Sequence, residues 1–339
     1  MTGRNPPIQG NANAVKRKPT KAGSGTSTNT STNTNTNTTP SAKQSTAPAK
    51  QTPSRPEAGA QTDNARPTPR QRWADIAKPV PPLPLDTPFI QGAIAGIDLQ
   101  KKQASLANTM RQHGDLHKQY GLYGNNILVL LTSQNKRECD LLFNAARARK
   151  PNGATLIRID HPGWSGVGNQ AYEGAGAIGA HNKVLTALGN LLVMPQHVKF
   201  LKDNKIGSIV VGAVEDFIVR ARGAGVDPAT KELVTNCPVD WGFVVFCRVR
   251  LAADPAFRWS TAVTQGAPVP MNHCITAGRA GYEDEKKTFG KVTIGKVIGE
   301  TGPENEKSWD EADWQAGLIG KSWYAMLGDA LNKVRIPWP

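Results

Sequence analysis

The sequence predicts an α/β protein in which a mixed, twisted sheet is flanked by helices and preceded by a disordered tail. Three observations lead to this prediction. Strand and helix patterns alternate between 127 and 211, consecutive strand patterns follow as far as 270, and a long polar segment precedes both regions. Alternating elements favour parallel strands and consecutive strands favour antiparallel pairing, so we expect both kinds of pairing in one sheet.

The first 72 residues contain almost no apolar side chains and are rich in Thr, Asn, Ser, Gly and Pro. Such a segment cannot bury enough apolar surface to offset the entropy of ordering its backbone, so we predict disorder. It holds eleven basic and two acidic residues, and therefore nine of the chain's fourteen net positive charges. A basic tail can bind nucleic acid or simply aid solubility. We favour solubility and do not expect nucleic acid as a partner.

A proline-rich stretch, WADIAKPVPPLPLDTP, follows the tail. Lys78, Pro81 and Pro84 have the spacing of a ligand for an SH3-type groove, which recognises a polyproline II helix. The alternative is a stiff spacer. We therefore divide the chain into a basic tail with its linker (1–88), a polar helical extension (89–125) and an α/β domain (126–339).

Cysteine usage and hydropathy indicate the compartment. The four cysteines are widely spaced, which predicts neither a zinc site nor a disulfide framework. No apolar run is long enough to span a membrane, and no signal-peptide core lies near Met1. We expect a soluble protein of the cytoplasm.

Hydrophobic periodicity predicts the elements of the domain. The apolar run at 127–131 is typical of a buried strand, and the amphipathic run at 139–149 predicts the helix after it. The remaining predicted elements are a strand at 154–160, a glycine-rich loop at 161–170, a helix at 175–192, strands at 206–211, 239–251 and 261–263, and a closing helix at 323–334.

Two polar features of this domain are candidate functional sites. Glu215 and Asp216 come at the predicted end of the strand that starts at Ile206, where carboxylates could bind a divalent metal ion. The alternative for Glu215 is an ion pair with Arg220, Arg222 or Lys321. The second feature is the polar loop at 132–138, since a loop between a strand and a helix can hold phosphate, although this one has no glycine-rich phosphate-binding pattern.

Six segments, taken in order, point to one family. They are TSQNK, VGNQAYEGAGAIGA, VVGAVEDFI, VDWGFVVFCRV, TQGAPVP and DWQAGLIGKSWYAMLGDAL. Over 126–334 this series resembles the non-standard purine nucleoside triphosphate phosphatase superfamily, which has the inosine/xanthosine triphosphatase-like (Maf/Ham-like) fold. Within it, the series is most similar to the C-terminal domain of eukaryotic proline-rich and coiled-coil-containing proteins.

The resemblance implies a central cleft, a dimer and a set of site residues. The enzymes of the superfamily hold triphosphate with the first strand–loop–helix, and an acidic residue on a central strand binds Mg²⁺ or activates water. Carried over, Glu215 is the catalytic acid and shares the metal with Asp216. The residues that would bind the phosphates are Thr132, Ser133, Asn135, Lys136 and Lys321.

Two departures from the enzyme pattern argue against catalysis. Glu138 stands where the enzymes have a lysine, so an anion faces the expected phosphate site, and Phe217 follows the acidic pair where the enzymes have small residues. We therefore predict a non-catalytic interaction or scaffold protein with a degenerate domain. The resemblance points to Golgi and secretory trafficking, or to a kinase regulatory subunit as partner. The alternative is a Mg²⁺-dependent pyrophosphatase that acts on the nucleotides ITP and XTP.

Overall fold

The computed structural model describes residues 78–112, 126–226, 233–251, 255–301 and 309–338, with only the backbone described at 221–226, 233–237 and 301. All of them belong to one compact unit, 64–339. The predicted disordered tail lies outside the described residues. Among the described helices, no candidate for a membrane-spanning segment is found by length and hydropathy.

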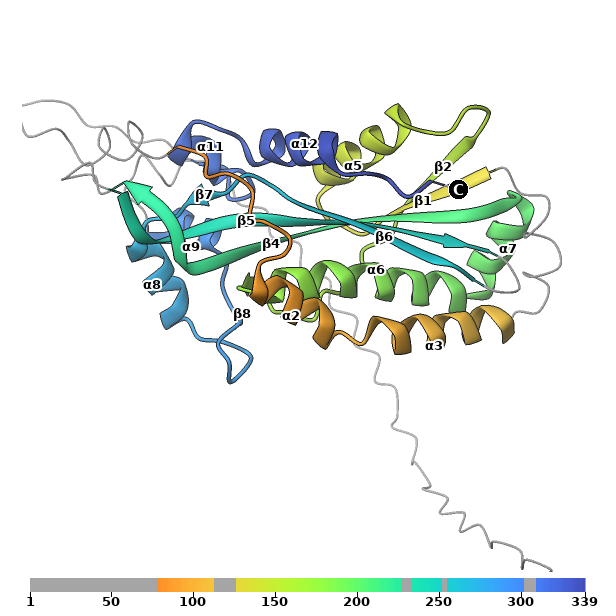
Figure 1. Cartoon of the computed structure of the whole chain (residues 1–339), viewed down its shortest axis with the longest axis horizontal. Coiled ribbons are helices and arrows are strands. Elements are labelled where there is room, and N and C mark those ends of the chain that lie inside the picture. The colour runs from red at the N-terminus through yellow and green to blue at the C-terminus, as the bar shows by residue number, and fades with distance from the viewer. Residues whose placement is uncertain (1–77, 113–125, 227–232, 252–254, 302–308, 339) are drawn as a thin grey trace, which may run out of the picture. The chain divides into compact units, whose positions relative to one another are not determined.

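A mixed sheet of eight strands forms the centre of this unit, as the sequence predicted (Figure 1). Its longest members, β4 (Ile206–Val226) and β5 (Leu233–Arg250), pair antiparallel along nearly their whole length. Parallel strands line the other side of β4: first β1 (Asn126–Leu131), which also pairs with β2 (Thr155–Asp160), and farther along β3 (Gln170–Tyr172).

Three short strands complete the sheet with antiparallel pairing. They are β6 (Phe257–Val263) and β7 (Ala267–Pro268), both paired with β5, and β8 (Phe289–Gly290), paired with β3. The acidic pair Glu215–Asp216 therefore lies in the middle of β4. The prediction that the strand ends there is wrong, because β5 pairs with β4 on both sides of the two residues.

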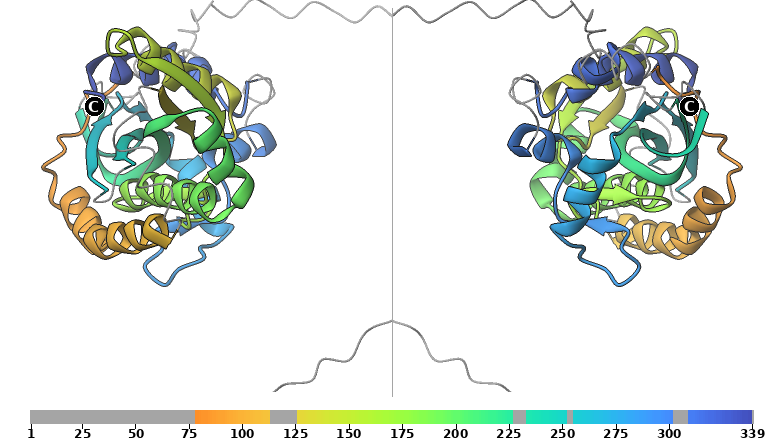
Figure 2. Two further views of the ribbon diagram at one scale, coloured as in Figure 1. Left: turned by 90° about the vertical axis from the view of Figure 1, so that its right-hand side faces the viewer. Right: turned by 90° about the vertical axis from the view of Figure 1, so that its left-hand side faces the viewer.

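Helices cover both faces of the sheet (Figures 1 and 2). One face carries α2 (Pro88–Gly96), α3 (Leu99–Gln112), α6 (Ala175–Val193) and α7 (Pro195–Asp203). The other carries α5 (Lys136–Ala148), α8 (Met271–Arg279), α9 (Ile294–Thr301), α11 (Trp314–Ile319) and α12 (Trp323–Lys333). The sequence patterns predicted α5, α6 and α12, and the predicted helical extension at 89–125 contains α3 and nearly all of α2, whereas α7 and α8 were missed.

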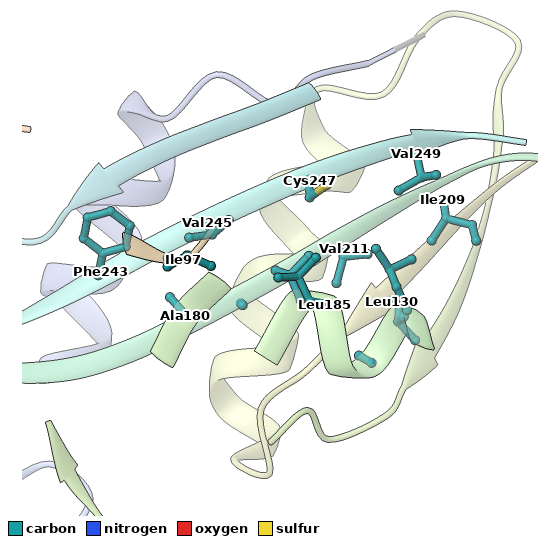
Figure 3. Packing of buried hydrophobic residues seen from close by; sticks show 14 of the residues in the cluster. Ile97, Leu130, Ala180, Leu185, Ile209, Val211, Phe243, Val245, Cys247 and Val249 are labelled. Atoms are coloured by element: carbon teal, nitrogen blue, oxygen red, sulfur yellow. The ribbon is translucent and has the colours of Figure 1, made fainter. Parts of the chain in front are cut away.

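Strand alternation divides the apolar side chains of β4 between two cores. Ile209, Val211 and Phe217 face α6, whereas Val210 and Val214 face α5 and α12. Figure 3 shows the first core, where β5 adds a row of side chains above α6. The segment predicted as a polar extension also belongs to this core, through the buried side chains of Ile90, Leu106 and Met110.

The small residues of α6 allow it to approach the sheet closely. A Cβ atom added at Gly176 would lie 2.4 Å from Cγ of Phe217, and one at Gly179 would lie 2.9 Å from Cδ of Glu215. Both distances are shorter than contacts between real atoms, so no larger residue fits at either position. The glycines thus bring the helix backbone against the acidic side chain of β4.

Candidate functional site

The loop after β1 lies beside the middle of β4. Thr132 and Ser133 are both buried, and Thr132 Oγ1 donates to a backbone carbonyl oxygen of β4 at 3.3 Å. The loop enters α5 at Asn135, whose side-chain oxygen accepts hydrogen bonds from the backbone N–H groups of Arg137 and Glu138. Such N–H groups are the ones with which a helix N-terminus holds phosphate. In this protein Asn135 caps them instead.

Glu138 turns its carboxylate back onto the same loop. Ser133 Oγ donates to one carboxylate oxygen at 2.5 Å, and Trp323 Nε1 donates to the other at 3.1 Å. The residue is only 9% exposed. A buried charge is tolerated when its hydrogen bonds are satisfied, and here both oxygens have a donor. The position that the family resemblance assigns to a lysine therefore holds a firmly bonded anion.

The two lysines predicted for phosphate binding differ in their pairing. Lys321 Nζ donates to Gln265 Oε1 at 2.5 Å and to Asp329 Oδ2 at 2.7 Å, so its charge is already paired. Lys136 is exposed at the start of α5 and has no polar partner in the described part of the chain. Thr132, Ser133 and Lys321 thus donate to other groups of the protein, whereas Lys136 is unpaired within the described residues.

Glu215 points toward α6 and forms an ion pair there with Lys183. The Lys183 Nζ to Glu215 Oε2 distance is 2.6 Å, and Lys183 Nζ also donates to the carbonyl oxygen of Val214 at 2.8 Å. Burial raises the pKa of Glu215, and Lys183 opposes part of that rise. Of the expected partners, Arg220 and Lys321 are not the ones used, and the side chain of Arg222 lies outside the described part of the structure. Glu215 is buried and neutralised, which is the structural alternative that the sequence left open.

Asp216 points to the opposite face of the sheet from Glu215. Consecutive residues of a strand face opposite sides, so Glu215 lies against α6 whereas Asp216 lines a cavity together with Asp240 of β5. The structure therefore does not bring the predicted metal pair, Glu215 and Asp216, together around one ion.

The cavity beside Asp216 has a volume of about 390 Å³ and is acidic. We call it the acidic cavity. No basic side chain is among the described residues that line it. Its polar lining consists of four carboxylates and four amide or hydroxyl side chains: Asp216, Asp240, Asp310, Glu311, Asn169, Gln170, Gln315 and Thr293.

Burial changes the acidity of the two carboxylates on the strands. It raises the pKa of Asp240 to about 7. A hydrogen bond that Gln315 Nε2 donates to Asp240 Oδ2 at 2.9 Å lowers this pKa and so offsets part of the rise. Burial also raises the pKa of Asp216 well above its usual range, with further increases from Glu138 and Asp240. Gln315 is 3% exposed, and its Oε1 has no hydrogen-bond partner in the described part of the protein.

The residues present do not fit the Mg²⁺ ion that the family resemblance implies. In the ranges that the structure describes, no group of three or more His, Cys, Asp or Glu side chains is close enough to hold a metal ion. Glu215 is occupied by Lys183, and Asp216 lies on the other face of the sheet. A hard divalent cation needs about six oxygen ligands at short distances, and this arrangement does not supply them.

The proline-rich segment packs on the domain. Val80 pairs with Gly266 through two backbone hydrogen bonds of 2.8 Å, and the indole Nε1 of Trp241 donates to the Pro81 carbonyl oxygen at 3.4 Å. Val80, Leu83 and Leu85 also pack against the first core. Binding of Lys78, Pro81 and Pro84 to an SH3-type groove would therefore require this segment to detach.

The sequence patterns missed the most informative polar residues of the region, Lys183 and Asp240. Lys183 follows a run of small residues on α6, and nothing in that run marks it as the partner of Glu215. Asp240 did leave a signal, since it is a carboxylate inside an apolar strand pattern. Buried charges of this kind are rare unless they are paired or functional.

Comparisons with known proteins show no family. No family model matches this chain, and no curated protein matches it. Among solved structures, protein VC0702 from Vibrio cholerae is similar, with a TM-score of 0.38 and 15% sequence identity over 60% of this chain and 90% of that one. A likeness this weak supports no conclusion about activity.

Proposed function

We propose that this chain is a non-catalytic interaction protein whose phosphatase-like domain does not hydrolyse nucleoside triphosphates. The observation that supports this most is the position of Glu138, a buried anion bonded to Ser133 and Trp323 at the loop where phosphates would bind. Two like charges about 4 Å apart repel each other by about 1 kcal/mol in water and by several times more at a partly buried site. A triphosphate entering here would meet that repulsion, and Asn135 already caps the α5 amides.

The acidic cavity suggests the chemistry of the partner. The exposed carboxylates of Asp310 and Glu311 and the unpartnered Gln315 Oε1 are acceptors at this cavity. Asp216 and Asp240, whose pKa values burial raises, become acceptors there when they are ionised. A donor-rich cation, such as the side chain of a lysine or an arginine, complements such a lining. The volume of about 390 Å³ accommodates a side chain of that size. The proposed partner is therefore a protein that presents a basic residue.

The family resemblance extends this proposal to a setting. Scaffolding in Golgi or secretory trafficking, or the holding of a kinase regulatory subunit, would suit an interaction protein of this kind.

An activity assay tests the non-catalytic part of the proposal. Purified full-length protein, incubated with ITP or XTP and Mg²⁺, is expected to release no pyrophosphate. Turnover that disappears in the Glu215→Gln variant, while circular dichroism shows that variant to be folded at the assay temperature, would contradict the proposal and support the pyrophosphatase alternative. One observation favours that alternative, namely that Asp216 and Asp240 share one cavity.

A binding assay tests the partner chemistry. A short arginine-rich peptide, titrated into the full chain by calorimetry, is expected to lose affinity when Asp310→Asn and Glu311→Gln are combined. The matched control combines Asp86→Asn with Glu285→Gln, two exposed acidic residues outside the cavity. Equal losses in the two double variants would show a general charge effect and refute the cavity as the binding site.

A further inference from the structure

A second cavity lies at the C-terminal end of α5, whereas the loop predicted to bind phosphate lies at the N-terminal end of that helix. It has a volume of about 810 Å³ and is formed by the C-terminal segment together with β6 and the end of α5. The 13 residues of α5 span about 20 Å, so this cavity is distinct from the loop at Asn135. We call it the basic groove. Four of the residues that line it are cationic: Arg149, Arg258, Lys333 and Arg335.

Among the described residues that line the groove, charge of one sign prevails. None of the described residues that line it is acidic. Arg258, Lys333 and Arg335 are exposed, and none of the three has a carboxylate partner among the described residues. Cations gathered in a concave surface create a positive potential that attracts anions.

A fifth cation stands directly beside the groove. Arg248 of β5 is opposite Arg258 of β6 in the strand register, and its Nη1 donates to the carbonyl oxygen of Trp338 at 3.3 Å. Like charges directly opposite each other on neighbouring strands destabilise a sheet. Together with burial, Arg258 and then Arg250 lower the pKa of Arg248. The fold therefore retains a cluster of charges that is unfavourable unless an anion is present.

Hydrogen-bond donors in this region also lack acceptors. Arg248 Nε and Trp338 Nε1 are both buried, and neither has a hydrogen-bond partner within the described structure. Arg149, in contrast, has its donors paired. It donates to the carbonyl oxygens of Leu331 and Val334 at 2.6 Å each and so holds the C-terminal segment against α5. One wall of the groove is thus fixed by Arg149, and the buried side-chain atoms without a partner in this region are all donors, namely Arg248 Nε, Trp259 Nε1 and Trp338 Nε1.

We infer that the basic groove binds a small molecule that carries several phosphate groups. Arginine side chains match phosphate oxygens in geometry and charge, and several phosphates are needed to balance this many cations. The volume of about 810 Å³ is in the range of small-molecule sites. A single-stranded nucleic acid would need a row of exposed aromatic rings, whereas Trp338 is half-buried.

Calorimetry on the full chain tests this inference, with tripolyphosphate and inositol hexakisphosphate as probes at physiological ionic strength. The double variant Arg258→Ser/Arg335→Ser is expected to weaken binding of both probes about tenfold or more. The control Arg279→Ser/Lys286→Ser removes the same charge from exposed positions outside the groove and is expected to leave affinity within about twofold. If only one probe depends on the groove arginines, that result identifies which carrier of the phosphates the groove accepts.

A second measurement locates the bound probe, because the basic tail could also bind it. Tripolyphosphate is expected to protect Arg258 and Arg335, but not Arg279, from modification by phenylglyoxal, read by mass spectrometry. Equal losses of affinity in the two double variants, or no selective protection, would overturn the inference. An oligothymidylate that binds more tightly than either probe and protects the same arginines would also overturn it, since the groove would then be a nucleic-acid interface.

Discussion

Replacement of Lys183 with methionine is expected to destabilise the protein mainly through Glu215. Methionine keeps the length and much of the volume of the lysine side chain, so packing against β4 changes little. Glu215 then keeps its burial but loses the cation at 2.6 Å. Removal of one member of a buried ion pair costs about 3–5 kcal/mol when the other charge stays buried.

Protonation limits this cost and makes it depend on pH. Without Lys183, Glu215 in the folded protein is expected to take up a proton rather than remain charged. Neutralising a carboxyl with an ordinary pKa of 4.5 at about pH 7 costs about 1.4 kcal/mol for each of roughly 2.5 units, or about 3.5 kcal/mol. The pKa of Glu215 in the folded variant is raised above its unfolded value. The free energy of unfolding of the variant is therefore retained at pH values below the unfolded pKa and decreases as the pH rises. The destabilisation should therefore fall to about 1 kcal/mol near pH 5.

Urea unfolding at about pH 5, 6 and 7 measures this directly, and urea is preferred because it does not screen charges. Lys183→Arg, which keeps the charge, is the matched control. The double variant Lys183→Met/Glu215→Leu removes both charges and is expected to restore the stability lost in Lys183→Met, or to exceed the wild type by up to about 4 kcal/mol. A loss in Lys183→Met that is the same at pH 5 and pH 7 would refute the reasoning, since the effect would then come from packing.

Three further predictions concern the sheet and its two faces. Asp240→Asn should become more stable relative to the wild type as the pH rises from about 4 to 7. The raised pKa of Asp240 in the folded protein, about 7, means that the wild type loses stability over this range. Melting temperatures of the two proteins that change in parallel with pH would contradict this. Gly176→Ala should cost about 1–3 kcal/mol by urea unfolding because its Cβ would lie 2.4 Å from Phe217, whereas Gly189→Ala on the same helix meets only Leu106 at 3.9 Å and should stabilise by about 0.5–1 kcal/mol. Arg258→Thr should raise stability by about 0.2–1 kcal/mol at low salt by relieving the repulsion from Arg248, and Arg258→Lys, which keeps the charge, should not.

The sequence by itself determined the fold class and most of the central elements. Periodicity is a local property, so the apolar runs at 127–131 and 239–251 predicted β1 and β5 without knowledge of their neighbours. The helices α7 and α8 were missed because they are nine residues each, with a proline at or next to the first residue, and such short segments show little periodicity. Glu138, which stands where the family resemblance would place a lysine, was also visible in the sequence, and the proposed function depends on it.

Only the tertiary structure decided what the charged side chains do. The strand pattern predicted that β4 ends at Glu215 and Asp216, whereas pairing with β5 carries the strand past them and alternation sends them to opposite faces. Ion pairs such as Lys183 with Glu215 join residues that are distant in the chain, and no local pattern encodes them. The acidic cavity and the basic groove arise in the same way, because each collects like charges from several elements that only the sheet and its helices bring together.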